Sequence, residues 1–223
     1  MAVPRNELKF YISSASAVLL FSRLSSVMQM DRHTDAFGKY RIRSLYYEDP
    51  AFTSYFDKLN GLEERKKYRL RFYNSDLSYI RLEKKEKRGK MCLKSVEVIS
   101  KPIAEALLLP DSEQSAGELV REMQERIRFE GFRPLLFVDY ERSAFLHPAG
   151  NVRITLDQNV VASRFAHSLV EDLTSVPVLE PGTSVLEVKY DEFFPPFLRG
   201  LLEDIPKLPA SISKFCLCTR ALF

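Results

Sequence analysis

The chain has 223 residues, 45% of them hydrophobic, and a formal net charge of +3 at pH 7. Such a composition is ample for a hydrophobic core, and no apolar run reaches the ~18 residues that a membrane helix needs. Three Cys residues form no even disulfide set, which favours a reducing compartment. Because the N-terminus lacks a signal-peptide pattern, we expect a cytoplasmic protein with no membrane span.

Apolar spacing predicts the elements, since alternation marks strands and a period of 3.6 marks helices. Towards the end of the chain, Cys216 and Cys218 are expected on one side of a closing strand over 211–218. The N-terminal part before that strand is predicted to contain a strand over 5–11, a helix from Ser13 or Ser14 to about Met28, a strand over 39–48 and a helix over 52–59 that Asn60-Gly61 ends. The middle is predicted to contain strands within 64–97 and helices over 103–109 and 115–130. After these we predict strands over 133–146 and 152–160 with a turn at 148–151, an unassigned segment over 163–177, a strand over 183–190 and a helix over 191–202.

The strands within 64–97 carry an unusual concentration of positive charge. Lys and Arg outnumber Asp and Glu by 13 to 4 between Arg65 and Lys101. A sheet face so dominated by one sign repels itself unless an anion binds to it. On one face of the alternating runs lie Arg65, Lys67, Arg69, Arg71, Arg81, Glu83 and Lys85.

Charged residues two apart recur in at least six predicted strands, among them Glu7-x-Lys9 and Glu187-x-Lys189. An ordinary sandwich with a solvated outer face explains any single strand. A closed barrel with a polar lumen and helices outside explains the repetition. Both alternatives stay open on pattern alone, and the simplest organisation is one domain over residues 1–223.

Seven segments then resemble a known family. They are KYRIRSLYYEDP, EERKKYRLRFY, IRLEKKEKRGK, VDYERSAF, VRITLD, LEVKYDEFFP and ISKF. In this order they are similar to the VTC-domain polyphosphate polymerases, members of the triphosphate tunnel metalloenzymes. The resemblance implies an α+β fold with a closed antiparallel eight-stranded tunnel and helices packed outside. It also implies transfer of the ATP γ-phosphate to a growing inorganic polyphosphate chain, with a divalent metal, Mn²⁺ before Mg²⁺, and no nucleic acid as partner.

The resemblance further implies roles for individual residues. Glu187 is the expected metal ligand, and Arg142, Arg153, Lys85 and Glu187 are the expected catalytic residues. We expect Arg142 and Arg153 to lie near each other across the hairpin and to clamp the triphosphate together. The expected phosphate-binding residues are Lys9, Arg43, Arg69, Arg71, Lys85, Lys94, Arg142, Arg153, Lys189 and Lys214.

Two departures from the family qualify these implications. Eukaryotic members add a regulatory domain and membrane spans, which leaves room here for a separate regulatory or membrane partner. Related triphosphatases begin with Glu-x-Glu-x-Lys, whereas this chain has Arg5 at the first position, followed by Glu7 and Lys9. The loss of one carboxylate favours the polymerase. The alternatives are a triphosphatase that hydrolyses tripolyphosphate or nucleoside triphosphates and a non-catalytic polyphosphate- or nucleotide-binding module.

Overall fold

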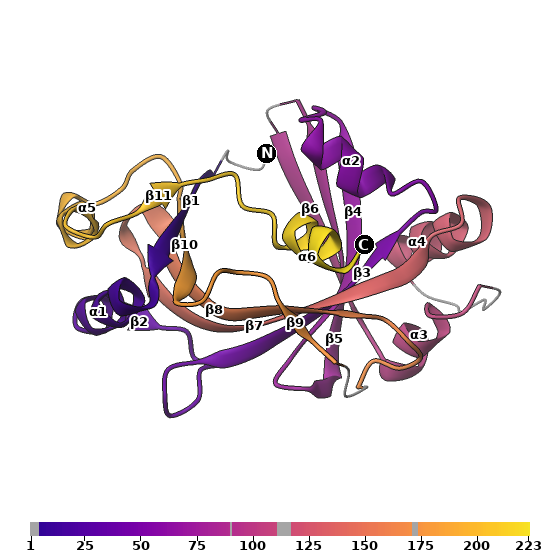
Figure 1. The fold of residues 1–223 in the computed structure, drawn as a ribbon, viewed down its shortest axis with the longest axis horizontal. Helices are drawn as coiled ribbons and strands as arrows, with labels where there is room; N and C mark the ends of the chain where they lie inside the picture. Colours follow the sequence, from indigo (N-terminus) through magenta and orange to yellow (C-terminus); the bar gives the residue numbers. More distant parts are fainter. Residues whose placement is uncertain (1–4, 90, 111–116, 171–173) are drawn as a thin grey trace. The chain divides into compact units, whose positions relative to one another are not determined.

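The structure is a computed structural model that describes residues 5–89, 91–110, 117–170 and 174–223. The fold is mixed α/β, with a large antiparallel sheet and helices outside it (Figure 1). Across the residues described, no helix combines the length and apolar character required to cross a membrane. The strands are β1 (Asn6–Ser13), β2 (Gln29–Met30), β3 (Tyr40–Glu48), β4 (Arg65–Tyr73), β5 (Asp76–Arg88), β6 (Met91–Ile99), β7 (Arg133–His147), β8 (Val152–Arg164), β9 (Val176–Pro177), β10 (Thr183–Tyr190) and β11 (Leu208–Pro209). The helices are α1 (Ser14–Ser25), α2 (Thr53–Leu59), α3 (Lys101–Ala106), α4 (Glu118–Phe129), α5 (Pro196–Glu203) and α6 (Lys214–Leu222), with a 3₁₀ turn η1 (Ala149–Asn151).

The sheet corrects the predicted barrel. Its hydrogen-bonded order is β11-β1-β10-β8-β7-β3-β4-β5-β6, with β2 added to β7 and β9 to β8. Within the described residues this order ends at β11 and β6, so the sheet has 11 strands and is not closed, and the prediction of a closed eight-stranded barrel is wrong. Local alternation determines which side of a strand a residue faces, but closure depends on pairing between strands distant in sequence.

Contacts divide the chain into two compact units, each described here by itself. The first unit comprises Met1–Arg41, Tyr140–Val160 and Pro177–Ser213. The second comprises Ile42–Asp139, Val161–Val176 and Lys214–Phe223. The organisation of residues 1–223 as one domain stays a prediction.

The first unit packs helices on one face of its strands. Helix α1 begins after Ser13, whose Oγ accepts a hydrogen bond from the Ser16 N–H at 3.0 Å, which confirms the predicted cap. Helix α1 contacts β1, β10 and α5. The buried core there includes Leu20, Leu24, Ile154, Leu156, Leu186, Val188, Leu198 and Leu202. Because strand side chains alternate, the other face of β1, β8 and β10 carries the polar residues.

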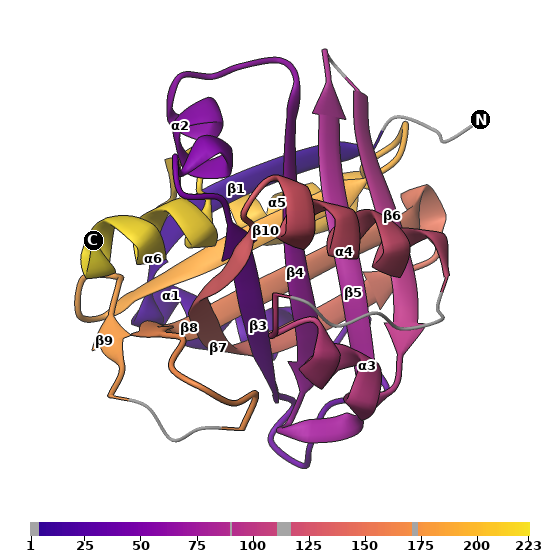
Figure 2. The ribbon, with the colours of Figure 1, turned by 90° about the vertical axis from the view of Figure 1, so that its right-hand side faces the viewer.

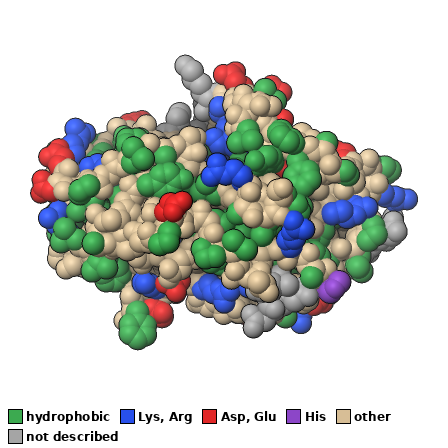
Figure 3. All heavy atoms as spheres, viewed as in Figure 1, with side chains coloured by type: hydrophobic (Ala, Val, Ile, Leu, Met, Phe, Trp, Pro, Cys, Tyr) green, Lys and Arg blue, Asp and Glu red, His purple; other side chains and the backbone are tan. Residues whose placement is uncertain are grey.

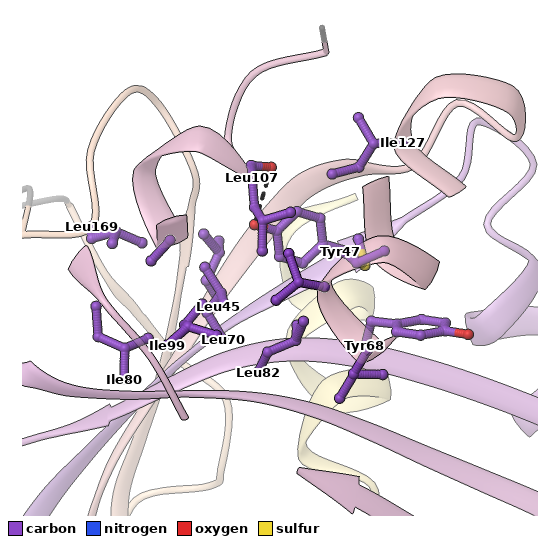
Figure 4. Packing of buried hydrophobic residues seen from close by; sticks show 14 of the residues in the cluster. Leu45, Tyr47, Tyr68, Leu70, Ile80, Leu82, Ile99, Leu107, Ile127 and Leu169 are labelled. Carbon is purple, nitrogen blue, oxygen red and sulfur yellow. Dashed lines mark hydrogen bonds between the residues drawn. The ribbon is translucent and has the colours of Figure 1, made fainter. Parts of the chain in front are cut away.

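In the second unit, helices also pack on one face of the strands, here β4, β5 and β6. Asn74 and Ser75, with φ of 51° and 60°, form the two-residue turn between β4 and β5, as type I′ hairpins require. Figure 2 shows α3 and α4 across one face of these strands. The core beneath them is drawn in Figure 4, where the Tyr47 hydroxyl donates to the Leu107 carbonyl at 3.3 Å. The opposite face of β4–β6 carries Arg69, Arg71, Lys85 and Lys94.

The chain end and the helix boundaries differ from the predictions in specific ways. The strand expected over 211–218 is not observed: α6 begins at Lys214 within it, and in this helix the Thr219 hydroxyl donates to the Phe215 carbonyl at 2.9 Å. Phe215, Cys216, Cys218 and Thr219 are buried, a helical spacing that a short apolar run did not distinguish from alternation. The predicted helix over 115–130 is observed as α4. The first two residues of the predicted range, 115 and 116, lie outside the described part of the chain.

Candidate phosphate-binding surfaces

In the second unit, three neighbouring strands bring the basic residues to one face. The register pairs Arg69 with Glu83, Arg71 with Arg81, and Lys85 with Lys94. Cross-strand partners point to the same side of a sheet. We call this face the Glu83 surface; it carries Lys67, Arg69, Arg71, Arg81, Glu83, Lys85 and Lys94.

Glu83 lies at the centre of this surface and contacts four cations. Arg69 Nη2 lies 2.6 Å and Arg71 Nη1 3.9 Å from its Oε2. Arg81 Nη2 lies 3.2 Å and Lys94 Nζ 2.8 Å from its Oε1. Glu83 is only 2% exposed, whereas the cations around it reach solvent to different extents. Four cations and one carboxylate give this cluster a formal charge of +3.

The pKa values on this surface report a strongly positive potential. Burial alone would raise the pKa of Glu83, but Arg69, Arg71 and Lys94 outweigh it and hold that pKa far below its ordinary value. Burial lowers the pKa of Lys94 to about 8, with Arg69 and Arg81 acting in the same direction and Glu83 against it. A surface that lowers the pKa of a carboxyl group and also that of an ammonium group has a positive potential, which favours a bound anion.

Tyr46 shows the same potential at the edge of the Glu83 surface. Its hydroxyl accepts a hydrogen bond from Arg69 Nη1 at 2.7 Å. Burial would raise the pKa of Tyr46, yet Arg69, Arg71 and Lys67 lower it. The Tyr46 ring stacks on Phe215 of α6 at 4.9 Å, which places the helix that begins at Lys214 beside this surface.

Arg43 does not belong to the Glu83 surface. The β3–β4 register pairs Arg43 with Phe72, whereas Ser44 and Tyr46 pair with Arg71 and Arg69. Arg43 therefore lies on the side of the apolar core, and its Nε and Nη2 donate to Asp139 at 2.9 and 3.0 Å. The sequence-based assignment of Arg43 to the polar face had the parity of β3 inverted, because tyrosines and serines there occupy the positions expected for apolar residues.

Arg81 belongs to this surface, although it was not among the predicted phosphate-binding residues. Its Nη1 donates to the Tyr73 hydroxyl at 3.2 Å, and its Nη2 pairs with Glu83. Its Nε is buried and has no hydrogen-bond partner in the described part of the chain. The signal was present in the sequence, since Arg81 is two residues before Glu83 and shares its face.

In the first unit, a second polar face collects most of the other predicted residues. Lys9 pairs with Glu187 between β1 and β10, and Lys189 pairs with Arg153 between β10 and β8. Thr155 on β8 lies opposite Glu187. We call this face the Glu187 surface; it carries Glu7, Lys9, Arg142, Arg153, Thr155, Asp157, Glu187 and Lys189.

Ion pairs connect this surface differently from the first. The Arg142 guanidinium binds Asp157 through two parallel hydrogen bonds, Nε to Oδ1 at 2.6 Å and Nη2 to Oδ2 at 2.7 Å. Arg142 Nη2 is also 3.9 Å from Glu187 Oε2, and Lys189 forms an ion pair with Glu187 Oε1. Burial opposes the charge of Arg142, but Asp157 raises its pKa well above the ordinary value. This surface carries four cations and three carboxylates, a much smaller excess of positive charge than on the Glu83 surface.

Arg142 and Arg153 donate hydrogen bonds to different residues. Arg142 binds Asp157, which lies four residues beyond Arg153 on β8. Arg153 Nη2 instead contacts Asp31 Oδ2 and the Tyr40 hydroxyl, each at 3.2 Å. Burial raises the pKa of Tyr40 and the charges of both Arg142 and Arg153 act against it, and the joint clamping of a triphosphate by the two arginines stays a prediction.

The described residues contain no group of three or more His, Cys, Asp or Glu side chains that could hold a metal. Glu187 offers one carboxylate on a polar face, and Mg²⁺-like ions usually take one or two carboxylates and complete their coordination with phosphate oxygens and water. The residues therefore fit a divalent ion that shares its ligands with a phosphate chain. They do not fit an ion held by protein alone.

Other parts of the exterior have mixed charge. Figure 3 shows Lys and Arg side chains interspersed with acidic and apolar ones on the face in view. On the helix-covered side of β4 and β5, Lys66 pairs with Glu86 at 3.8 Å and Lys84 pairs with Glu122. The excess of positive charge is thus specific to the Glu83 surface and not to these strands as a whole.

Comparisons with known proteins agree with this fold. The VTC domain model matches residues 4–223, and the chain belongs to the VTC domain family. A putative adenylate cyclase from Bacillus halodurans is similar in structure, with a TM-score of 0.56, 14% identity, and coverage of 94% of this chain and 96% of the other. A putative adenylyl cyclase from Hippeastrum, described as having a dominant triphosphatase activity, has a TM-score of 0.58, 18% identity, and coverage of 96% and 95%. A comparison with curated protein sequences finds no match.

Proposed function

We propose that this protein is a polyphosphate polymerase that transfers the γ-phosphate of ATP to a growing inorganic polyphosphate chain with the help of a divalent metal, Mn²⁺ before Mg²⁺. Membership of the VTC domain family supports the proposal. The single observation that carries it is the Glu83 surface, where four cations surround one buried carboxylate. Such a face suits a linear polyanion with regularly spaced negative charges.

We assign the two surfaces different tasks. Arg69, Arg71, Arg81, Lys85 and Lys94 hold phosphates by charge, and the arginines among them add bidentate hydrogen bonds. On the Glu187 surface, Arg142 orients the phosphoryl group while Asp157 fixes its guanidinium.

Glu187 would hold the metal, which supplies neutralisation of phosphate charge when bound. Lys9, Arg153 and Lys189 are the further proposed phosphate contacts on that surface, and Lys214 is proposed at the start of α6. That all these residues line one tunnel stays a prediction.

Phosphoryl transfer suits this set of residues because the reaction needs positioning and charge stabilisation more than covalent catalysis. The bond between the γ-phosphorus and its bridging oxygen breaks, ADP leaves, and a terminal polyphosphate oxygen forms the new bond. No Ser, Cys or His nucleophile takes part in this proposal.

A triphosphatase is the second candidate. It is favoured by the carboxylates on the Glu187 surface and by the Hippeastrum structure, which is described as having a dominant triphosphatase activity. The two candidates share the sites and differ in the acceptor, which is a phosphate chain in one and water in the other.

Product analysis separates these candidates. Purified protein is incubated with ATP and Mn²⁺, phosphate chains are resolved on a gel, and released phosphate is measured in parallel. We expect chains that lengthen with time. Phosphate release without chain growth would support the triphosphatase, and tripolyphosphate binding without any turnover would support a non-catalytic binding module.

A binding control tests the Glu83 surface itself. Arg81→Gln should weaken tripolyphosphate binding about tenfold, the scale of one charge-assisted hydrogen bond. Lys66→Gln removes one cation from the opposite face of β4, where Lys66 is 3.8 Å from Glu86, and should leave binding unchanged. Equal losses in both variants would mean that total charge matters and that the surface is not a specific site.

A further inference from the structure

Thr155 carries a buried hydroxyl that makes no hydrogen bond to the described residues. The residue is 3% exposed, and its Oγ1 has no hydrogen-bond partner among the residues described. Buried hydroxyls in folded proteins are nearly always hydrogen-bonded, because desolvation without a partner is unfavourable. A hydroxyl of this kind on a candidate binding face therefore points to a partner that it acquires in another state.

The register identifies a polar side chain opposite Thr155. Thr155 on β8 lies directly opposite Glu187 on β10. Side chains of such cross-strand pairs lie on the same face, with Cβ atoms about 4.5–5.5 Å apart. Asp157, two residues further along β8, already receives both hydrogen bonds of the Arg142 guanidinium. Glu187 is thus the carboxylate within reach whose partners can change.

Those partners are the groups that phosphate would attract. Glu187 pairs with Lys189 and lies 3.9 Å from Arg142 Nη2. Both cations are phosphate contacts in the function proposed above. When a phosphate chain attracts the Lys189 ammonium, Glu187 loses that ion pair, and its carboxylate can turn towards a new partner.

We infer that Thr155 is the positioning residue of Glu187, and this inference rests on the proposed function. In the phosphate-bound state the Thr155 O–H donates to the Glu187 carboxylate and holds it in the orientation that receives the divalent ion. The hydroxyl touches neither phosphate nor metal. No covalent step is involved, and the only change is the formation of one hydrogen bond.

Thr155→Val tests this, because it removes the hydroxyl and nearly preserves the shape. Tripolyphosphate binding is measured by calorimetry in EDTA and then with Mn²⁺, alongside thermal unfolding without ligands. We expect the melting temperature and the EDTA affinity to stay as in the parent protein. We expect the gain in affinity that Mn²⁺ produces to fall about tenfold, the lower end of what loss of a partner to a metal ligand costs.

Two further variants make the result specific. Thr155→Ser keeps the hydroxyl and should retain most of the Mn²⁺-dependent gain. In a Glu187→Gln background, Thr155→Val should have no additional effect, because the hydroxyl acts through that carboxylate.

Three results would overturn the inference. A loss of EDTA affinity in Thr155→Val would make the hydroxyl a direct phosphate ligand. An unchanged Mn²⁺-dependent gain would leave it without a role in the site. A parent protein that gains no affinity from Mn²⁺ and shows no turnover would reject the proposed function, and the inference with it.

Discussion

Lys94 on the edge strand β6 reaches Glu83 on β5, with 2.8 Å between Lys94 Nζ and Glu83 Oε1. The Lys94 ammonium forms an ion pair with a carboxylate, and yet its pKa is lowered to about 8, because burial and the charges of Arg69 and Arg81 outweigh the attraction of Glu83. A lysine poised in this way changes its charge close to physiological pH.

The first prediction follows from that lysine. A bound phosphate chain raises the pKa of Lys94, so binding takes up a proton above about pH 8, and affinity falls as pH rises through that value. We expect tripolyphosphate affinity in EDTA to fall between roughly pH 7 and pH 9, more in the parent protein than in Lys94→Arg, whose guanidinium stays charged. The titration of the ligand is common to both proteins and cancels in the comparison. Identical pH profiles would contradict the prediction.

The second prediction concerns Glu83 and stability. Glu83→Gln leaves four cations without their shared carboxylate and should lower the free energy of unfolding by about 1–3 kcal/mol at pH 7 in urea titrations. Since the pKa of Glu83 is far below its ordinary value in the folded protein, its contribution is present above that ordinary value and is lost as pH falls. The gap between parent and variant should therefore narrow from about pH 5 downwards. A gap that is independent of pH would show that Glu83 stabilises by packing instead.

The third prediction separates binding from orientation at Arg142. Arg142→Lys keeps the charge but loses the two parallel hydrogen bonds to Asp157. Turnover should fall by about 10²-fold, the scale of a misplaced catalytic group, while tripolyphosphate affinity falls much less. Arg153→Lys, whose parent guanidinium contacts Asp31 and Tyr40 through single hydrogen bonds, should lose less turnover. Circular dichroism and thermal unfolding check that both variants fold.

If Arg142→Lys were as active as the parent protein, Arg142 would contribute only general positive charge. If Arg142→Ala then retained turnover as well, the residue would have no place in the reaction. Arg142→Ala is expected to lose both affinity and turnover.

The fourth prediction concerns the proposed metal ligand. Glu187→Gln should reduce Mn²⁺-dependent turnover by about 10²-fold or more, the cost of losing one preorganised charged group. Tripolyphosphate affinity in EDTA should be kept or should rise, because Lys189 and Arg142 are released from the carboxylate. Calorimetry with and without Mn²⁺ measures both effects. Unchanged turnover would move the metal to another carboxylate, with Glu7 the next to test.

The sequence alone determined the faces of most strands and the family. Period-two alternation placed Arg69 and Arg71 on one face of β4, and Glu83 and Lys85 on one face of β5, because a strand side chain can point in only two directions. The caps and turns were equally local, as at Ser13 and at Asn74-Ser75. Motifs in family order then indicated the VTC domain family, which the match over residues 4–223 shows.

Only the tertiary structure decided which strands pair and which charges meet. The open order of the sheet and the position of Arg43 on the core side depend on the pairing and register of strands distant in sequence. So do the contacts of Glu83 with four cations and the position opposite Glu187 of the Thr155 hydroxyl, which has no hydrogen-bond partner among the described residues. The alternation of a strand is a property of its own backbone, whereas register and ion-pair choice are set by the core packing that aligns one strand with the next.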